Sequence, residues 1–201
     1  MDSPDDYDSP WKEAVESYFP EFIEFYFPEA SRQIDWARGY QFLDQELRAV
    51  VQDAELGKRF VDKLAKVALC DGSERWVYVH LEVQGSAQAE FAERMFVYNY
   101  RLYDRYRQPV ASLAVLADTT ANWRPNHFGF AVLGCEHELR FPAVKLLDYA
   151  AQQDQLYQNP NPFALVTLAH LLTQATRQDM NARFAAKWKL VQLLYQRGWD
   201  K

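Results

Sequence analysis

Apolar residues near the start of the chain recur every three or four positions, which is the spacing of one face of a helix. The stripe in residues 11–27 consists of Val15, Tyr18, Phe19, Phe22, Ile23 and Tyr26. Ser9 and Pro10 precede it, and this pair is typical of an N-cap followed by proline at the first helical position. Pro20 is expected to kink the helix or to split it in two, and Pro28 to end it.

Two β-rich runs follow at residues 60–69 and 74–85, and the Asp-Gly pair at 71–72 between them favours a hairpin turn. Side chains alternate along a strand, so one face of the second run is expected to carry Trp76, Tyr78, His80, Glu82 and Gln84. Counting outward from the turn predicts that Asp62 lies nearly opposite Glu82, within about 5 Å at Cβ.

The rest of the chain alternates helical and strand-like patterns. Residues 88–107 form a predicted helix whose apolar positions are Phe91, Met95, Tyr98, Leu102 and Tyr106. The apolar run at 110–118 predicts a buried strand, 129–134 a further strand, and the pattern is helical from 162 onward. Residues 46–53 fit a helix or a strand. A hairpin that leads into a helix and then a strand indicates an α/β fold, with a mixed β-sheet flanked by helices and a helical C-terminal part.

Composition describes a folded protein. Hydrophobic residues make up 49% of the 201 positions, enough for a substantial core, and no long linker divides the chain. We expect one domain over residues 9–201, with a helical extension from about residue 162, behind a disordered acidic N-terminus at 1–8. The net charge of −6 argues against non-specific DNA binding through bulk charge, but it leaves room for a local basic groove.

Several protein classes require features that the sequence lacks. No run of about 18 uncharged apolar residues occurs, so we expect no membrane-spanning helix and no membrane partner. The acidic start is unlike a secretory signal. Cys70 and Cys135 fit neither a disulfide framework nor a metal site, which makes a reducing cytoplasm the expected location. GxSxG, HExxH and glycine-rich phosphate motifs are missing.

The predicted hairpin offers the strongest candidate for chemistry. Asp62 and Glu82 are two carboxylates expected to face each other, and such a pair repels unless a cation lies between them. Mg²⁺ prefers oxygen ligands and is often held by one or two carboxylates together with phosphate oxygens. A metal in this position could activate water and neutralise charge on a phosphodiester. The alternative is a solvated sheet face with two incidental acids.

The order of short motifs along the chain resembles one group of nucleases. Asp62 followed after the hairpin by Glu82-Val83-Gln84 resembles the PD-(D/E)xK signature of restriction-endonuclease-like enzymes. More narrowly, the chain resembles the recombination-promoting nuclease/putative transposase family of bacterial proteins. The matching segments are DSPWK (8–12), FLDQEL (42–47), VDKL (61–64), VYVHLEVQ (77–84) and RMFVY (94–98).

The resemblance implies a restriction-endonuclease-like core and a Mg²⁺ or Mn²⁺ ion held by Asp62 and Glu82. It places Gln84 at the position of the signature lysine, as a third catalytic residue, and Glu13 at the acidic group that the first helix often adds. Glutamine cannot supply positive charge, but its amide can orient water.

Other residues near the expected site have alternative roles. Lys12 or Arg94 would supply the cation that Gln84 lacks. His80 either reaches the metal from the same strand face or is a packed or solvent-facing histidine. Four residues recur at helical spacing beyond the site: Arg94, Tyr98, Arg101 and Arg105. The arginines either contact DNA phosphates, with Tyr98 hydrogen-bonding near the metal, or belong to a solvated helix with Tyr98 in its core.

Two functions are consistent with these observations. The first is a Mg²⁺-dependent deoxyribonuclease that cuts DNA, in recombination or mobile-element biology as the resemblance implies. The second is a catalytically weak or inactive nuclease-fold module that binds nucleic acid or protein, which the glutamine at position 84 favours. The sequence leaves open whether the chain forms a homo-oligomer.

Overall fold

The computed structural model describes residues 8–51, 60–82 and 88–198 of the chain. The chain divides into two compact units, Met1–Lys145 and Leu146–Lys201. The first unit is mixed α/β and the second is helical. Within the three described ranges, no helix is long and apolar enough to cross a membrane.

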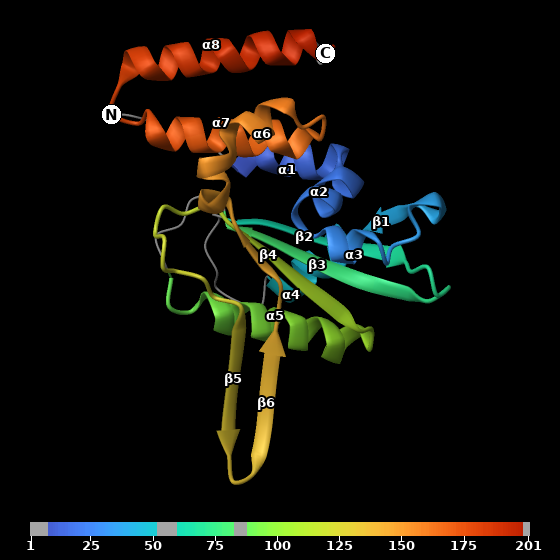
Figure 1. Cartoon of the computed structure of the whole chain (residues 1–201). Helices are drawn as coiled ribbons and strands as arrows, with labels where there is room; N and C mark the ends of the chain where they lie inside the picture. Colours follow the sequence, from blue (N-terminus) through green and yellow to red (C-terminus); the bar gives the residue numbers. More distant parts are fainter. Residues whose placement is uncertain (1–7, 52–59, 83–87, 199–201) are drawn as a thin grey trace. The chain divides into compact units, whose positions relative to one another are not determined.

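A five-stranded mixed sheet organises the first unit (Figure 1). Its strands in spatial order are β1 (Tyr40–Phe42), β2 (Phe60–Ala68), β3 (Glu74–Glu82), β4 (Val110–Leu116) and β7 (Ala143–Lys145). β2 is antiparallel to both β1 and β3, whereas β4 runs parallel to β3 and β7 runs parallel to β4. This confirms the mixed α/β sheet that the sequence predicts. It also brings the carboxyl ends of three parallel strands to one edge.

The β2–β3 hairpin confirms the predicted strands, but its loop is longer than a two-residue Asp-Gly turn. The amide of Leu69 donates to the carbonyl of Ser73 at 2.7 Å, which leaves three residues in the loop. Gly72 takes a left-handed φ of 84°, which a residue without Cβ adopts at no steric cost. Asp71 accepts hydrogen bonds from both the amide and the hydroxyl of Ser73, and the hydroxyl bond is the main reason that the pKa of Asp71 is lowered.

The pairing register of this hairpin differs from the sequence-based expectation. Asp62 has His80 as its Cα partner and Glu82 has Phe60, so the prediction that Asp62 lies opposite Glu82 is wrong by two positions. A two-residue turn at 71–72 would pair Asp62 with Leu81, and the one extra loop residue moves its partner to His80, because loop length determines which residues of a hairpin pair. Asp62 and Glu82 remain diagonal neighbours on adjacent strands.

Proline positions divide the N-terminal segment into helices. The three helices are α1 (Asp8–Ser17), α2 (Phe19–Tyr26) and α3 (Pro28–Ser31). The predicted split at Pro20 is confirmed, and this proline lies in the first turn of α2, where its missing N–H costs no helical hydrogen bond. Pro28 ends α2 but also begins α3. α1 begins one residue before Ser9, which therefore lies inside the helix instead of capping it.

Helix α5 (Phe91–Tyr106) links β3 to β4 and builds the core over one face of the sheet. The segment at 46–53, ambiguous in sequence, contributes to helix α4 (Asp44–Val51), which packs against α5 and β2. A short 3-10 helix, η1 (Trp36–Arg38), precedes β1. The buried core cluster is Leu43, Leu47, Leu64, Phe91, Met95, Tyr98, Leu102, Ala114, Leu116 and Phe141.

A second, two-stranded sheet extends away from the main one in Figure 1. It consists of β5 (His127–Val132) and β6 (Cys135–Arg140). Leu133 and Gly134 form its turn with φ values of 52° and 79°, and positive φ at both central residues is the geometry that matches the twist of paired strands. The rings of Phe96 in α5 and Phe128 in β5 lie 5.3 Å apart and attach the base of this hairpin to the core.

The second unit contains only helices within its described residues. These are η2 (Leu146–Gln152), α6 (Gln153–Gln158), α7 (Pro162–Ala175) and α8 (Met180–Gln196). Asn161 caps α7 by accepting from the amide of Phe163 at 2.9 Å, with Pro162 at the first helical position. Asp179 caps α8 in the same way, accepting from the amide of Asn181 at 2.9 Å. The helical pattern predicted from residue 162 is confirmed.

Candidate functional site

Three parallel strands end at the same edge of the sheet, and their last residues are in register. Glu82 of β3 pairs with Leu116 of β4, which pairs with Lys145 of β7. In open α/β sheets, ligands bind outside the carboxyl ends of parallel strands. This edge is therefore the candidate site, and β2 contributes Phe60 and Asp62 beside Glu82.

The backbone places Asp62 and Glu82 on neighbouring strands, two register positions apart. Diagonal neighbours in an antiparallel pair lie roughly 7–8 Å apart, a separation that two carboxylates could span by sharing one metal ion. The side chains of Asp62, His80 and Glu82, and the whole of Gln84, lie outside the part of the chain that the structure describes. Among the side chains that it does describe, no group of three His, Cys, Asp or Glu residues could hold a metal.

A buried ion pair lies at this edge, and sequence reasoning missed it. Lys145, the last residue of β7, donates from Nζ to Oδ2 of Asp118 at 2.5 Å, and both side chains are almost wholly buried. The same Nζ donates to the carbonyl of Trp123 at 3.3 Å and lies 5.3 Å from the centre of its ring. The other oxygen of Asp118 accepts from the amide of Thr120 at 2.8 Å.

This ion pair is close to the proposed carboxylates in register. Lys145 and Glu82 occupy one row, two strands apart, which corresponds to roughly 10 Å between their backbones. Because Asp118 neutralises the ammonium, the pair stiffens the strand ends and does not offer a free cation to a ligand. The sequence contains one signal for this pair. Asp118 ends the apolar run at 110–118, and an acid buried at the end of such a strand needs a cationic partner.

The residue after Asp62 holds β2 against two helices. Lys63 is buried, contacts Oε1 of Glu16 in α1, and donates to Oδ1 of Asp44 in α4 at 3.2 Å. Its ammonium also lies 5.1 Å from the centre of the Phe42 ring. These contacts anchor the strand at the position next to Asp62. Two of the motif segments, at 42–47 and 61–64, therefore meet through a charged contact in the fold.

The first helix contacts the sheet through an acid other than Glu13. Lys12 and Glu13 are both exposed on α1. Glu16, one turn further along, is the acid of α1 that contacts Lys63 of β2. The roles that the resemblance implies for Lys12 and Glu13 stay predictions.

Arg94 and Tyr98 lie on the buried face of α5. Tyr98 belongs to the core cluster, which agrees with the alternative in which Tyr98 packs in the core of the helix. Arg94 donates from Nη1 to Oε1 of Gln88 at 2.9 Å, and its guanidinium lies 5.5 Å from the centre of the Phe91 ring. Because α5 connects two parallel strands, its first turn is at the same end of the sheet as Glu82.

Arg101 and Arg105 lie further along α5, away from this end. Arg101 is half-buried, and Arg105 is exposed with its guanidinium 5.7 Å from the centre of the Tyr106 ring. They follow Arg94 by seven and eleven residues, or about 10 and 16 Å along the helix axis. These arginines would therefore bind other phosphates of the DNA than the one that lies at the strand ends.

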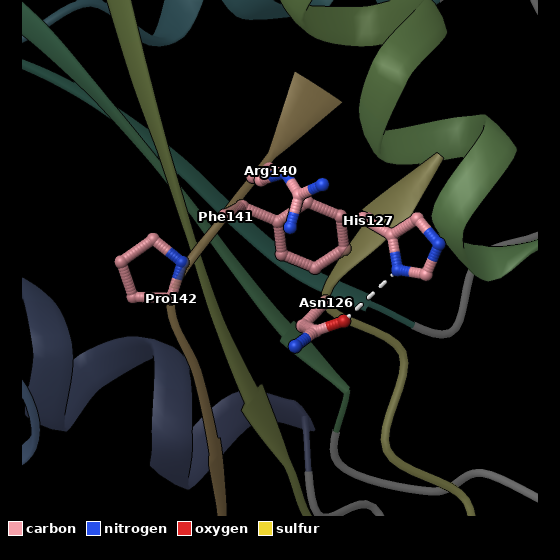
Figure 2. Close-up of a pocket in the computed structure, with 5 residues that line it drawn as sticks. All are labelled: Asn126, His127, Arg140, Phe141 and Pro142. Atoms are coloured by element: carbon pink, nitrogen blue, oxygen red, sulfur yellow. Dashed lines mark hydrogen bonds between the residues drawn. The ribbon is translucent and has the colours of Figure 1, made fainter. Parts of the chain in front are cut away.

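A cavity of about 210 Å³ lies where β5 and β6 join the rest of the unit (Figure 2). Its lining residues are Asn126, His127, Arg140, Phe141 and Pro142. Nδ1 of His127 lies 3.1 Å from Oδ1 of Asn126, and Arg140 forms a 2.8 Å ion pair with Glu138. The Arg140 side chain is largely exposed and already paired, so this cavity provides no buried charge to recognise a ligand.

Comparison of the chain with protein-family models, with curated proteins and with solved structures finds no match. The resemblance drawn from the short motifs therefore depends on those residues alone.

Proposed function

We propose that the chain is a metal-dependent DNA endonuclease with a restriction-endonuclease-like core, in which Asp62 and Glu82 hold Mg²⁺ or Mn²⁺. One observation carries the proposal: the two acids of the motif pattern occupy diagonal positions on adjacent strands, at the edge where three parallel strands end. The order of elements adds support, because the hairpin leads into α5 and then into a parallel strand.

The donor set suits a hard divalent cation. Mg²⁺ takes oxygen ligands and commonly keeps waters and substrate phosphates beside one or two carboxylates. When bound, the ion would supply a nucleophilic water and neutralise charge on the scissile phosphodiester. Asp62 and Glu82 would hold it, and the amide of Gln84 would orient the water through a hydrogen bond. Lys63 and Lys145, each bound to a carboxylate on a neighbouring element, would keep the supporting strands rigid.

The second candidate is a nuclease-fold module that binds nucleic acid or protein without cutting it. Gln84 favours this function, because the signature lysine provides a charge that glutamine does not. The buried lysines of the described sheet do not replace that charge. Lys63 is bound to Asp44, and Lys145 to Asp118.

Cleavage of supercoiled plasmid in the presence of Mg²⁺ separates the two functions. The wild type is expected to nick or cut the plasmid, and Asp62→Asn and Glu82→Gln to lose cleavage while staying folded. Asp104→Asn is the matched control, since Asp104 is an exposed acid paired with Arg107 on α5, and it should cut normally. Gln84→Lys should preserve or raise the rate, because lysine is the residue of the signature.

Calorimetry supplies an independent readout of the metal. Mg²⁺ or Mn²⁺ should raise the unfolding temperature of the wild type by binding to the native state, and Glu82→Gln should abolish this shift. A folded wild type that neither cuts DNA nor responds to metal refutes the nuclease. If that protein still binds labelled duplex, the second candidate takes its place.

A further inference from the structure

The last helix of the chain carries a continuous apolar stripe on its exposed face. The stripe residues and their exposed fractions are Met180 at 87%, Phe184 at 72%, Trp188 at 58%, Val191 at 39% and Tyr195 at 68%. At 100° per residue, all five fall within an arc of about 80° on α8. Isolated apolar side chains are normal on a surface, but a contiguous row containing three aromatic rings marks a binding surface.

The spacing within the stripe indicates what kind of surface it fits. Phe184, Trp188, Val191 and Tyr195 follow each other at intervals of four, three and four residues. These are the a and d positions of a heptad pattern, the narrow seam through which one helix packs along another. The stripe is thus shaped for a second helix.

The unit does not use this stripe for its own packing. α8 packs against α7 (Figure 1). On the side of α8 opposite the stripe, four residues are half-buried: Ala182, Ala186, Leu190 and Leu193. Two charged side chains also attach α8 to α6. Lys189 lies 4.2 Å from the centre of the Tyr157 ring, and Arg197, just after the helix, donates to the carbonyl of Tyr157 at 2.6 Å. The helix therefore has one apolar side in the unit and a second one exposed.

We propose that this stripe is a dimerisation surface, and that it packs in antiparallel orientation against the same stripe of a second copy of the chain. The three aromatic side chains have roughly 200 Å² each and are about two-thirds exposed, so with Met180 and Val191 the stripe offers about 550 Å². Two copies would bury roughly 1,100 Å² in total, just above the area of about 1,000 Å² that a specific interface requires. A twofold dimer uses the same patch on both chains, so it needs no second surface.

Charge selects the antiparallel orientation. α8 contains Arg183, Lys187 and Lys189 and no acidic residue. Two parallel copies would align Lys187 with its own equivalent and the helix dipoles with each other, and both arrangements are repulsive. In the antiparallel pair, Trp188 faces Val191 of the second copy, Lys187 is displaced from its equivalent by about five residues along the axis, and the two helix dipoles point in opposite directions. This inference does not depend on the proposed nuclease activity.

Sedimentation equilibrium of the full chain tests the proposal. The wild type is expected to be a dimer, and Phe184→Ser/Trp188→Ser to weaken dimerisation at least about 100-fold, because buried aromatic residues dominate interfaces. Tyr100→Ser/Tyr103→Ser is the matched control: both tyrosines are exposed on α5, by 58% and 47%, and their loss should leave the dimer intact. Circular dichroism checks that each variant is folded. A monomeric wild type, or a dimer that survives the loss of both stripe aromatics, overturns the proposal.

Two further measurements separate the alternatives. Spin labels at Asn181→Cys, with Cys70 and Cys135 replaced by serine, should lie roughly 25–30 Å apart in the antiparallel dimer, whereas about 10 Å would show a parallel pair and refute the arrangement. Co-sedimentation with phosphatidylserine vesicles tests a lipid surface instead. If a monomeric wild type binds the vesicles and the stripe variant does not, the stripe serves a membrane and not a second copy.

Discussion

Replacing Lys145 with methionine should destabilise the first unit strongly. The change leaves the Asp118 carboxylate buried, with the Thr120 amide as a donor but without the cation that now lies 2.5 Å away. Breaking a buried ion pair from one side typically costs about 3–5 kcal/mol, since the remaining charge is uncompensated. For a chain of this size that loss lowers the unfolding temperature by roughly 6–20 °C.

The two partners should differ in how much their loss costs. In Asp118→Asn, Lys145 keeps the Trp123 carbonyl and ring, and the new amide oxygen can still accept its hydrogen bond. We expect this variant to lose about 1–3 kcal/mol. The double variant Asp118→Leu/Lys145→Met removes both charges, and it should be more stable than Lys145→Met alone because no uncompensated charge stays buried.

Urea titration followed by circular dichroism and by tryptophan fluorescence measures these differences. At a slope of about 1–3 kcal/mol per molar urea, a loss of about 3–5 kcal/mol in Lys145→Met should lower the midpoint by roughly 1–5 M. Lys12→Met is the matched control, an exposed lysine of the same unit whose loss should change stability by less than about 0.5 kcal/mol. A loss below about 1 kcal/mol in Lys145→Met, or a double variant less stable than that single one, would refute the assigned role of the pair.

Three further outcomes are expected. Gly129→Ala should disrupt the β5–β6 hairpin, because an added Cβ would lie 2.6 Å from a backbone oxygen of β6, and loss of amide protection confined to these strands in hydrogen exchange would show it. The Ser73 hydrogen bond lowers the pKa of Asp71, so the stabilisation is present above the ordinary carboxyl pKa of about 3.9 and is lost as pH falls through the lower folded value. Asp71→Ala should therefore lower the unfolding temperature at pH 7 and have less effect at pH 2, and an equal effect at both would contradict this. Arg101→Gln/Arg105→Gln should flatten the slope of log affinity against log salt for duplex DNA by at most about 2, whereas unchanged slopes would remove both arginines from the DNA surface.

Local signals were enough for most elements of the fold. The split between α1 and α2, the β2–β3 hairpin, α5 and the buried strand β4 all follow from apolar periodicity and from residues such as Pro20 and Gly72. These signals can be recognised in the sequence because a proline, or an apolar repeat of 3.6 residues, determines the backbone conformation of residues close to it along the chain. The segment at 46–53 lacked such a signal; its residues up to Val51 belong to α4, which packs against α5 and β2, and residues 52–53 lie outside the described part of the chain.

The candidate site was only partly accessible from sequence. The sequence proposed Asp62 and Glu82 as the acids of the site, but it did not give their register, because an Asp-Gly pair fits hairpin loops of more than one length. The extra loop residue was determined by how the whole hairpin pairs. A change in loop length alters every residue pair along both strands. An uncertainty of one residue in the loop therefore changes which residue lies opposite Asp62 at the site.

The amino-acid sequence alone predicted most of the long helices and strands, and it supplied Asp62 and Glu82 as candidate metal ligands. Only the tertiary structure decided which charges meet: Lys145 with Asp118 across 27 positions, and Lys63 with Asp44 across 19. It also decided which apolar face of α8 is packed and which is exposed. The physical reason is that helix and strand patterns arise from neighbours along the chain. A buried charge or an apolar face takes its partner from elements that fold beside it, and the spacing of residues along the chain does not encode that proximity.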